Sequence, residues 1–251
     1  MTTLFVSDLH LDPTRPEATE QFLAFLATQA AEAEALYILG DLFEAWIGDD
    51  DPEPEKHRVL AAIRTLTDGG QTCYFMRGNR DFLVGEEFSR ETGCKLLEDP
   101  TIVDLYGERV LLMHGDTLCT DDTSYQEFRS MVRNPAWQSE FLAMSIPERL
   151  TMAEQARAKS REHVKATADT IMDVNSAAVL ETMKQHGVHS LLHGHTHRPA
   201  VHELIIDGQA ASRIVLGDWY EQGSVVRWDA TGPRLEFLPR KREAGSRKRE
   251  E

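Results

Sequence analysis

Side chains suited to divalent metal ions recur in five short blocks along the chain. The blocks are Asp8-Leu9-His10, Gly40-Asp41, Gly78-Asn79-Arg80-Asp81, His114-Gly115-Asp116 and His193-Gly194-His195-Thr196-His197. Together they offer carboxylate and amide oxygens beside imidazole nitrogens, a mixture that suits Mn, Fe or Zn. The number of ligands is sufficient for two ions. Each block alone is a common turn or surface sequence, so the prediction depends on the complete, ordered set.

Each of the five blocks begins where a short apolar run ends. The runs are Leu4–Val6, Leu36–Leu39, Cys73–Met76, Val110–Met113 and Ser190–Leu192. Short apolar runs bounded by glycine and polar residues are typical of strands buried on both faces. Binding sites in layered α/β folds lie at the carboxyl ends of such strands. We therefore expect the five blocks to converge on one place.

The remaining patterns predict helices and further strands around this sheet. Apolar spacing indicates helices over about 17–34 and 53–67, and Tyr106-Gly107-Glu108 indicates a hairpin between strands 102–105 and 109–113. Residues 201–206, 212–216 and 224–228 are expected to be antiparallel strands, with Asp207-Gly208 as a turn between the first two. The predicted fold class is α/β, an α+β sandwich of sheets with helices on the outside.

The segment 125–165 breaks this pattern because it contains no predicted strand. It is rich in Met and aromatic residues and has seven Lys and Arg against five Asp and Glu, a net charge of +2 in a chain whose total is -15. Two interpretations are open. The segment could be helices packed on the core, or it could be a helical cap that shelters flexible apolar chains and lies against anionic lipid.

Composition limits the classes of function. The net charge of -15 argues against general binding of nucleic acids. The three cysteines lack CxxC spacing and are expected to be buried free thiols in a reducing compartment. The sequence shows no signal-peptide pattern at its start and no apolar run of about 18 residues. We expect a cytoplasmic protein whose charged tail, residues 239–251, is disordered.

The ordered metal-ligand blocks resemble the calcineurin-like metallophosphoesterase superfamily, over about residues 3–228. Most of that superfamily has His after the Gly-Asn pair, where this chain has Arg80. The resemblance implies a four-layer fold formed by residues 1–238, with a helical cap insertion at about 122–168.

Longer stretches narrow this resemblance. They are residues 37–50, 78–83, 112–116, 171–175 and 193–199. They resemble the UDP-2,3-diacylglucosamine pyrophosphatases of the lipid A pathway in Gram-negative bacteria. The resemblance implies hydrolysis of UDP-2,3-diacylglucosamine to 2,3-diacylglucosamine 1-phosphate and UMP by a monomer that is peripheral on the cytoplasmic face of the inner membrane.

The same resemblance implies a ligand set and two ions, with Mn2+ favoured. One ion would bind Asp8, His10, Asp41 and His197, and the other would bind Asp41, Asn79, His114 and His195. Asp41, Asn79 and Arg80 would be the catalytic residues. Two ions roughly 3.5–4 Å apart would activate water for in-line attack on the phosphorus that bears uridine. Arg80 would neutralise charge in the transition state. Asp81 and Asp116 would orient the ligand imidazoles. His193 would support its loop, and a weak phosphate contact by His193 stays open.

Substrate contacts are also implied by the resemblance. They are assigned to Asn79, Arg80, Asp122, Tyr125, Arg157, Ser160 and His195. The family's cap lysine near position 167 is absent, because this chain has Thr167, and whether Lys165 replaces it stays open. Two other functions are weighed: a general nucleotide or phosphodiester hydrolase of the same superfamily, which Arg80 and the apolar cap disfavour, and a non-catalytic scaffold, which the complete ligand set disfavours.

Overall fold

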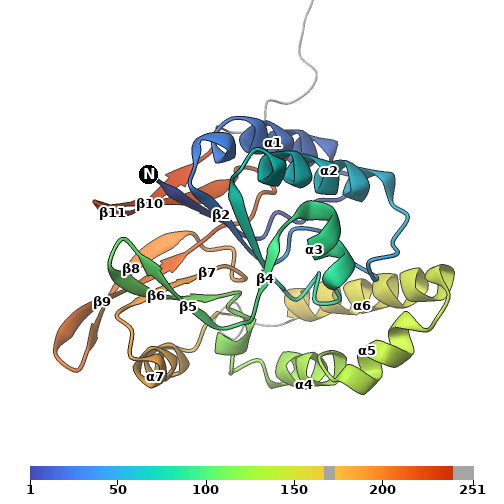
Figure 1. Cartoon of the computed structure of the whole chain (residues 1–251). Coiled ribbons are helices and arrows are strands. Elements are labelled where there is room, and N and C mark those ends of the chain that lie inside the picture. The colour runs from blue at the N-terminus through green and yellow to red at the C-terminus, as the bar shows by residue number, and fades with distance from the viewer. Residues whose placement is uncertain (167–172, 240–251) are drawn as a thin grey trace, which may run out of the picture.

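The computed structural model describes residues 1–166 and 173–239, so Thr167 and most of the charged tail lie outside the described residues. Two β-sheets form the centre of the molecule (Figure 1). The six-stranded sheet has the order β11 (Gly232–Phe237), β10 (Ser224–Asp229), β1 (Thr3–Val6), β2 (Ala35–Leu39), β3 (Thr72–Met76) and β4 (Lys95–Leu97). The five-stranded sheet has the order β5 (Thr101–Leu105), β6 (Glu108–Met113), β7 (Ser190–His193), β9 (Gln209–Val215) and β8 (Ala200–Ile206).

Four layers follow from how these sheets are covered. Helices α1 (Pro16–Ala27), α2 (Pro54–Asp68) and α3 (Glu86–Thr92) pack on the outer face of the six-stranded sheet, and α7 (Ser176–His186) packs on the outer face of the other sheet (Figure 1). Between the sheets lies a second apolar cluster that includes Phe5, Leu39, Leu112 and Leu192. Successive side chains of a strand point to opposite faces, so each central strand contributes to two apolar layers. The four-layer fold expected from the sequence is confirmed.

The parallel strands bring the five blocks to one edge. Strands β1, β2 and β3 are parallel neighbours, and so are β6 and β7. All five strands were predicted from their apolar runs, and they end directly before or within the metal-ligand blocks. The carboxyl ends of both sheets therefore deliver these blocks to a common region.

Three further helices follow the ligand block at His114. They are α4 (Thr123–Val132), α5 (Pro135–Leu142) and α6 (Ile146–Ala166), and they lie together at one side of the sandwich (Figure 1). We call α4 to α6 the helical segment. Each of α4 and α5 begins with a polar capping side chain, Asp122 and Asn134 respectively, that accepts a backbone N–H. The prediction of helices without strands for this part of the chain is correct.

Several element boundaries differ from the sequence predictions. The helix expected over 17–34 ends at Ala27, because Thr28 leaves the helical conformation (φ -119°, ψ -83°), and a short 3-10 turn, η1 (Ala30–Glu32), precedes β2. Glu108 belongs to β6, and the hairpin turn is Tyr106-Gly107, both with positive φ. Strand β9 is antiparallel to β8 but parallel to β7, and β10 pairs with β1 in the other sheet.

Two predictions from composition can be compared with the described residues. Cys73, Cys94 and Cys119 are all buried cysteines outside any disulfide, as expected. In the part of the chain that the structure describes, no helix combines the length and apolar character needed to cross a membrane.

Candidate metal centre and substrate pocket

Backbone hydrogen bonds join the loops that follow the strands. Asp8 donates its N–H to the carbonyl of Gly40, His10 donates to Asp41, and Gly194 donates to His114. A side chain at Gly78 or Gly194 would not fit between these loops. A Cβ at Gly78 would lie 2.1 Å from Oδ1 of Asp41, and one at Gly194 would lie 2.2 Å from Oδ2 of Asp8. Glycine thus allows the loops to approach closely enough for their side chains to share one site.

The candidate ligands are held in an uncommon backbone conformation. Among the described residues, seven other than glycine have positive φ, and five of these are Asp8, His10, Asp41, His195 and His197. The other two lie in hairpin turns. Such conformations cost about 1–3 kcal/mol each and persist where surrounding structure enforces them, commonly at functional sites. The strain therefore marks the same loops that the sequence pattern selected.

The first group of candidate ligands joins the ends of β1 and β7. Ligand atoms of Asp8, His10 and His197 lie within 4.8 Å of one another. Nε2 of His10 is 3.0 Å from Nε2 of His197, and Nε2 of His197 is 3.4 Å from Oδ1 of Asp8. Asp41 also approaches, with Oδ2 3.8 Å from Nε2 of His10. These four side chains are the set assigned to one ion from the sequence.

The second group surrounds the amide of Asn79. Its Oδ1 is 2.9 Å from Nε2 of His114 and 2.9 Å from Nδ1 of His195. Oδ1 of Asp41 lies 3.8 Å from Nε2 of His114. Asp8, Asp41 and His114 also form a group whose ligand atoms are within 4.8 Å of one another. Asp41 is thus close to both groups, the place expected for a shared ligand.

The donor set fits divalent cations. Oδ1 of Asp8 is buried and has no hydrogen-bond partner among the described residues, although Nε2 of His197 approaches it at 3.4 Å. The two facing Nε2 atoms of His10 and His197 could both bind a cation lying between them. Burial acts to lower the pKa of His114, but Asp41, Asp116 and Asp8 outweigh it and raise that pKa to about 9. Carboxylates that favour a proton on this imidazole also favour a metal ion at the same place.

The expected roles of Asp81 and Asp116 are wrong in detail. Asp81 accepts backbone N–H groups of Asp41, Leu42 and Gly78, so it holds two loops together instead of orienting an imidazole. Asp116 accepts hydrogen bonds from the Tyr125 hydroxyl and from Nε of Arg129 on α4. The backbone carbonyl of Leu39 accepts from Nδ1 of His114 instead. A backbone carbonyl thus takes the role expected for a carboxylate at His114, because sequence spacing does not show which acceptor reaches a ring.

His193 supports the loop that contains His195, as expected. Its ring is fully buried, and its Nδ1 lies 2.8 Å from the carbonyl oxygen of Gly194. Nη1 of Arg213 lies 3.2 Å from Nε2 of His193. Burial lowers the pKa of His193 to about 3. A neutral ring that donates from Nδ1 and accepts at Nε2 fits both contacts.

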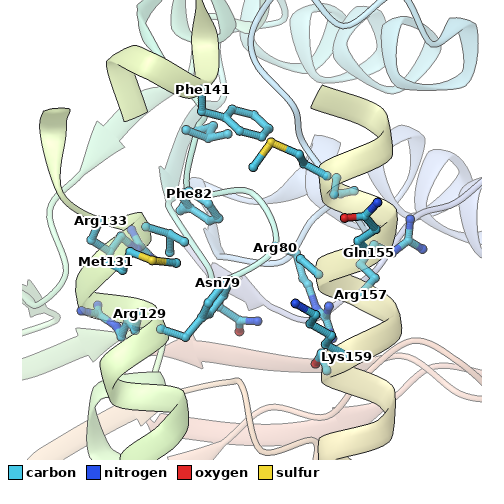
Figure 2. A pocket seen from close by; sticks show the side chains of 18 of the residues that line it. Asn79, Arg80, Phe82, Arg129, Met131, Arg133, Phe141, Gln155, Arg157 and Lys159 are labelled. Carbon is cyan, nitrogen blue, oxygen red and sulfur yellow. The ribbon is translucent and has the colours of Figure 1, made fainter. Parts of the chain in front are cut away.

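A cavity of about 500 Å³ adjoins the candidate metal centre. Asn79 and Arg80 line it at the end near the metal ligands, and the helical segment forms its walls (Figure 2). Its lining includes the apolar side chains of Phe82, Met131 and Phe141. It also includes one acidic residue, Glu44, and five cations, Arg80, Arg129, Arg133, Arg157 and Lys159. The cavity therefore combines a positively charged region beside the metal ligands with an apolar region beneath the helices.

Most, but not all, of the residues predicted to bind substrate line this cavity. Tyr125, Arg157 and Ser160 line it, together with Asn79 and Arg80. The Tyr125 ring is also tilted against His195, with centroids 5.7 Å apart. Asp122 is not among the lining residues, and its carboxylate instead accepts from the Tyr125 N–H and the Ser124 hydroxyl at the start of α4. Lys165 belongs to α6, but its side chain lies outside what the structure describes.

Glu44 was not selected from the sequence although it lies at the centre. Its Oε2 is 3.1 Å from Nδ1 of His10, and its Oε1 is 3.3 Å from Nη2 of Arg157. Burial acts to raise the pKa of Glu44, but His10, Arg80 and Arg157 hold it at about 2. Tyr220, also missed, stacks on His10 at 5.3 Å. The position of Glu44 three residues after Asp41 was a weak signal, because it is not part of a recognised ligand block.

Comparisons with known proteins identify the family of this chain. A curated relative, the UDP-2,3-diacylglucosamine hydrolase of Stenotrophomonas maltophilia (strain R551-3), is 54% identical over 247 residues, which cover 96% of this chain and 100% of the relative. The protein of the same name from Xanthomonas axonopodis pv. citri is 54% identical over 245 residues, 95% of this chain and 99% of the relative. A solved archaeal phosphodiesterase aligns with 95% of this chain and 100% of its own at 13% identity and a TM-score of 0.49. The family model described as calcineurin-like phosphoesterase matches residues 1–199. With its site, its layers and this match in agreement, the chain belongs to the calcineurin-like phosphoesterase family.

Proposed function

We propose that this chain is a metal-dependent hydrolase that cleaves the pyrophosphate bond of UDP-2,3-diacylglucosamine, giving 2,3-diacylglucosamine 1-phosphate and UMP in lipid A biosynthesis. The observation that carries the proposal is the cavity that joins the candidate metal centre to an apolar region, with Asn79 and Arg80 belonging to both. A simple phosphodiester would need the metal centre but not the apolar region. The curated relatives at 54% identity bear the name of this activity.

Two divalent ions, with Mn2+ as the favoured metal, complete this site. Asp8, His10, Asp41 and His197 would hold one ion, and Asp41, Asn79, His114 and His195 would hold the other. The observed approach of these side chains in two groups that share Asp41 supports the assignment. When bound, such ions lower the pKa of water and neutralise phosphoryl oxygens.

The protein's own cations position the pyrophosphate. Arg80 lies beside Asp41, to which its backbone N–H donates, and its guanidinium lines the cavity. It presents a planar fork of donors to phosphate and keeps its charge throughout, so it stabilises negative charge without transferring a proton. Arg157, Tyr125 and Ser160 line the cavity and would contact the glucosamine phosphate. Water would then attack the phosphorus that bears uridine, with the sugar 1-phosphate as the leaving group.

The helical segment receives the acyl chains. It is the cap within residues 122–168, and Phe82, Met131 and Phe141 give the cavity the apolar surface that such chains require. Phe128, Met131 and Leu142 also expose 42%, 49% and 42% of their surface. Exposed apolar side chains beside basic ones favour peripheral contact with the cytoplasmic face of the inner membrane, from which the monomer takes its substrate.

Hydrolysis assays test the proposal directly. EDTA-treated protein is incubated with UDP-2,3-diacylglucosamine, with and without added Mn2+, and UDP-N-acetylglucosamine is run in parallel. The expected result is release of UMP from the acylated substrate alone, and only with metal. Comparable turnover of UDP-N-acetylglucosamine would contradict the role of the apolar cavity. If protein shown to contain metal hydrolyses neither compound, the assignment of the substrate is wrong.

A further inference from the structure

Glu44 lies between the candidate metal centre and the helical segment. It follows β2 and is mostly buried, with 14% of its side chain exposed. Its two carboxylate oxygens contact different groups. Oε2 approaches Nδ1 of His10 at 3.1 Å, and Oε1 approaches Nη2 of Arg157 at 3.3 Å. One carboxylate thus touches a candidate metal ligand and a residue of the substrate cavity.

The contact with His10 is on the side of the ring away from the ligand group. Nε2 of His10 faces that group, 3.0 Å from Nε2 of His197 and 3.8 Å from Oδ2 of Asp41. A carboxylate beside the opposite nitrogen favours the tautomer with a proton on Nδ1, which leaves the lone pair of Nε2 directed at a metal. Glu44 is therefore placed to favour this tautomer, although the 3.1 Å approach does not have hydrogen-bond geometry.

The contact with Arg157 connects the same carboxylate to α6. Arg157 belongs to α6 and lines the cavity, as do Arg80 and Lys159 (Figure 2). Its Nη2 is also 3.5 Å from Oδ2 of Asp12, so two carboxylates hold the guanidinium. Asp12 has no such contact with His10 among the interactions of the described residues, which makes it a matched control for Glu44.

A second connection limits how far α6 can move relative to Glu44. Arg149, two helical turns before Arg157, donates to the carbonyl of Ile47 and forms an ion pair with Asp50. Polar contacts thus join the loop after β2 to α6 near Arg149 and near Arg157. Of these, the contact through Glu44 also reaches the candidate metal centre. Removal of the Arg157 guanidinium would therefore take away the contact that holds Oε1 of Glu44.

We propose that Glu44 is a positioning residue that couples the placement of Arg157 on α6 to the orientation of the metal ligand His10. The chemistry of this coupling rests on the proposed function, because His10 orientation matters through the metal. Losing the contact with His10 weakens the metal site directly. Losing the contact with Arg157 weakens substrate binding and, because Glu44 is released, also weakens the metal site.

Metal affinity gives a test that does not depend on any substrate. Mn2+ titration of metal-free protein by calorimetry compares wild type with Glu44→Ala, Glu44→Gln and Asp12→Asn. Glu44→Ala should weaken Mn2+ binding by about 10- to 100-fold, the usual effect of removing a carboxylate that orients a ligand imidazole. Glu44→Gln retains an oxygen acceptor for His10 and should stay within about threefold of wild type, and Asp12→Asn should be unchanged. Wild-type affinity in folded Glu44→Ala would overturn the proposal.

Coupling is tested by a double-mutant cycle with Arg157→Gln. This substitution should weaken Mn2+ binding measurably in the wild-type background, because Glu44 is released, but not in Glu44→Gln. An equal effect of Arg157→Gln in both backgrounds would disprove the coupling. Thermal unfolding of each variant identifies any loss of fold, and the near-isosteric Glu44→Gln keeps the cycle informative if Glu44→Ala is unstable.

Turnover is measured separately, so failure of the substrate assignment leaves these metal titrations valid. KM should rise in Glu44→Gln with kcat less affected.

Discussion

Gly78→Ala is the substitution whose effect on the site follows most directly from the structure. The added Cβ would lie 2.1 Å from Oδ1 and 2.4 Å from the backbone nitrogen of Asp41. Real contacts of this kind exceed 3.0 Å, so the Asp41 carboxylate must withdraw by about 1 Å. Metal sites tolerate about 0.2 Å in ligand distance, and a displacement of about 1 Å in a catalytic group can cost on the order of 100-fold in rate. Overpacking should also lower the free energy of unfolding by about 1–3 kcal/mol.

The measurements for Gly78→Ala are kcat at saturating Mn2+, metal content by elemental analysis and thermal unfolding. We expect a loss of at least about 100-fold in kcat with reduced metal content, in protein that still folds. Gly69→Ala is the matched control, because its Cβ would meet the end of the flexible Gln71 side chain first and its φ is -70°. Wild-type activity and metal content in Gly78→Ala would refute the assignment of Asp41 as the ligand shared by both groups.

Three further predictions concern charge. Arg80→Ala should lower kcat by about 100-fold or more while Mn2+ affinity stays unchanged, and equal turnover in the variant would remove Arg80 from the mechanism. Arg149→Met leaves the Ile47 carbonyl without its donor and should lower Tm by about 2–10 °C. Arg149→Lys should lower Tm by less. An unchanged Tm in Arg149→Met would show that this contact does not hold α6. Burial, with the nearby charge of Asp116, raises the pKa of Asp99 to about 6, so its ionisation costs stability as pH rises through about 4 to 6. Asp99→Asn should therefore raise the free energy of unfolding by on the order of 1–2 kcal/mol over wild type at pH 7.5, and by little at pH 4. Urea unfolding of metal-free protein measures both values. An equal increase at the two pH values would exclude the titration of Asp99 as the cause.

The sequence was sufficient for the elements that repeat a strong local pattern. The strands before Asp8, Asp41, Asn79, His114 and His193 were predicted because each is a short apolar run that stops at a polar block. Helix α2 was predicted within one residue at each end, since Pro54 and Gly69 bound it. Weak patterns failed: β4 has three residues, and β11 is a half-exposed edge strand that begins with Gly232-Pro233.

By itself, then, the sequence determined which residues could bind metal and that they would meet at strand ends, because ligand chemistry and apolar periodicity are local properties. Only the tertiary structure decided which atoms meet. In that structure Glu44 lies between His10 and Arg157, Asp81 accepts hydrogen bonds from the backbone of two loops, and Asp116 accepts a hydrogen bond from Arg129. These contacts join segments up to 113 residues apart for Glu44 and Arg157, and they depend on packing and hydrogen-bond geometry that no local spacing specifies.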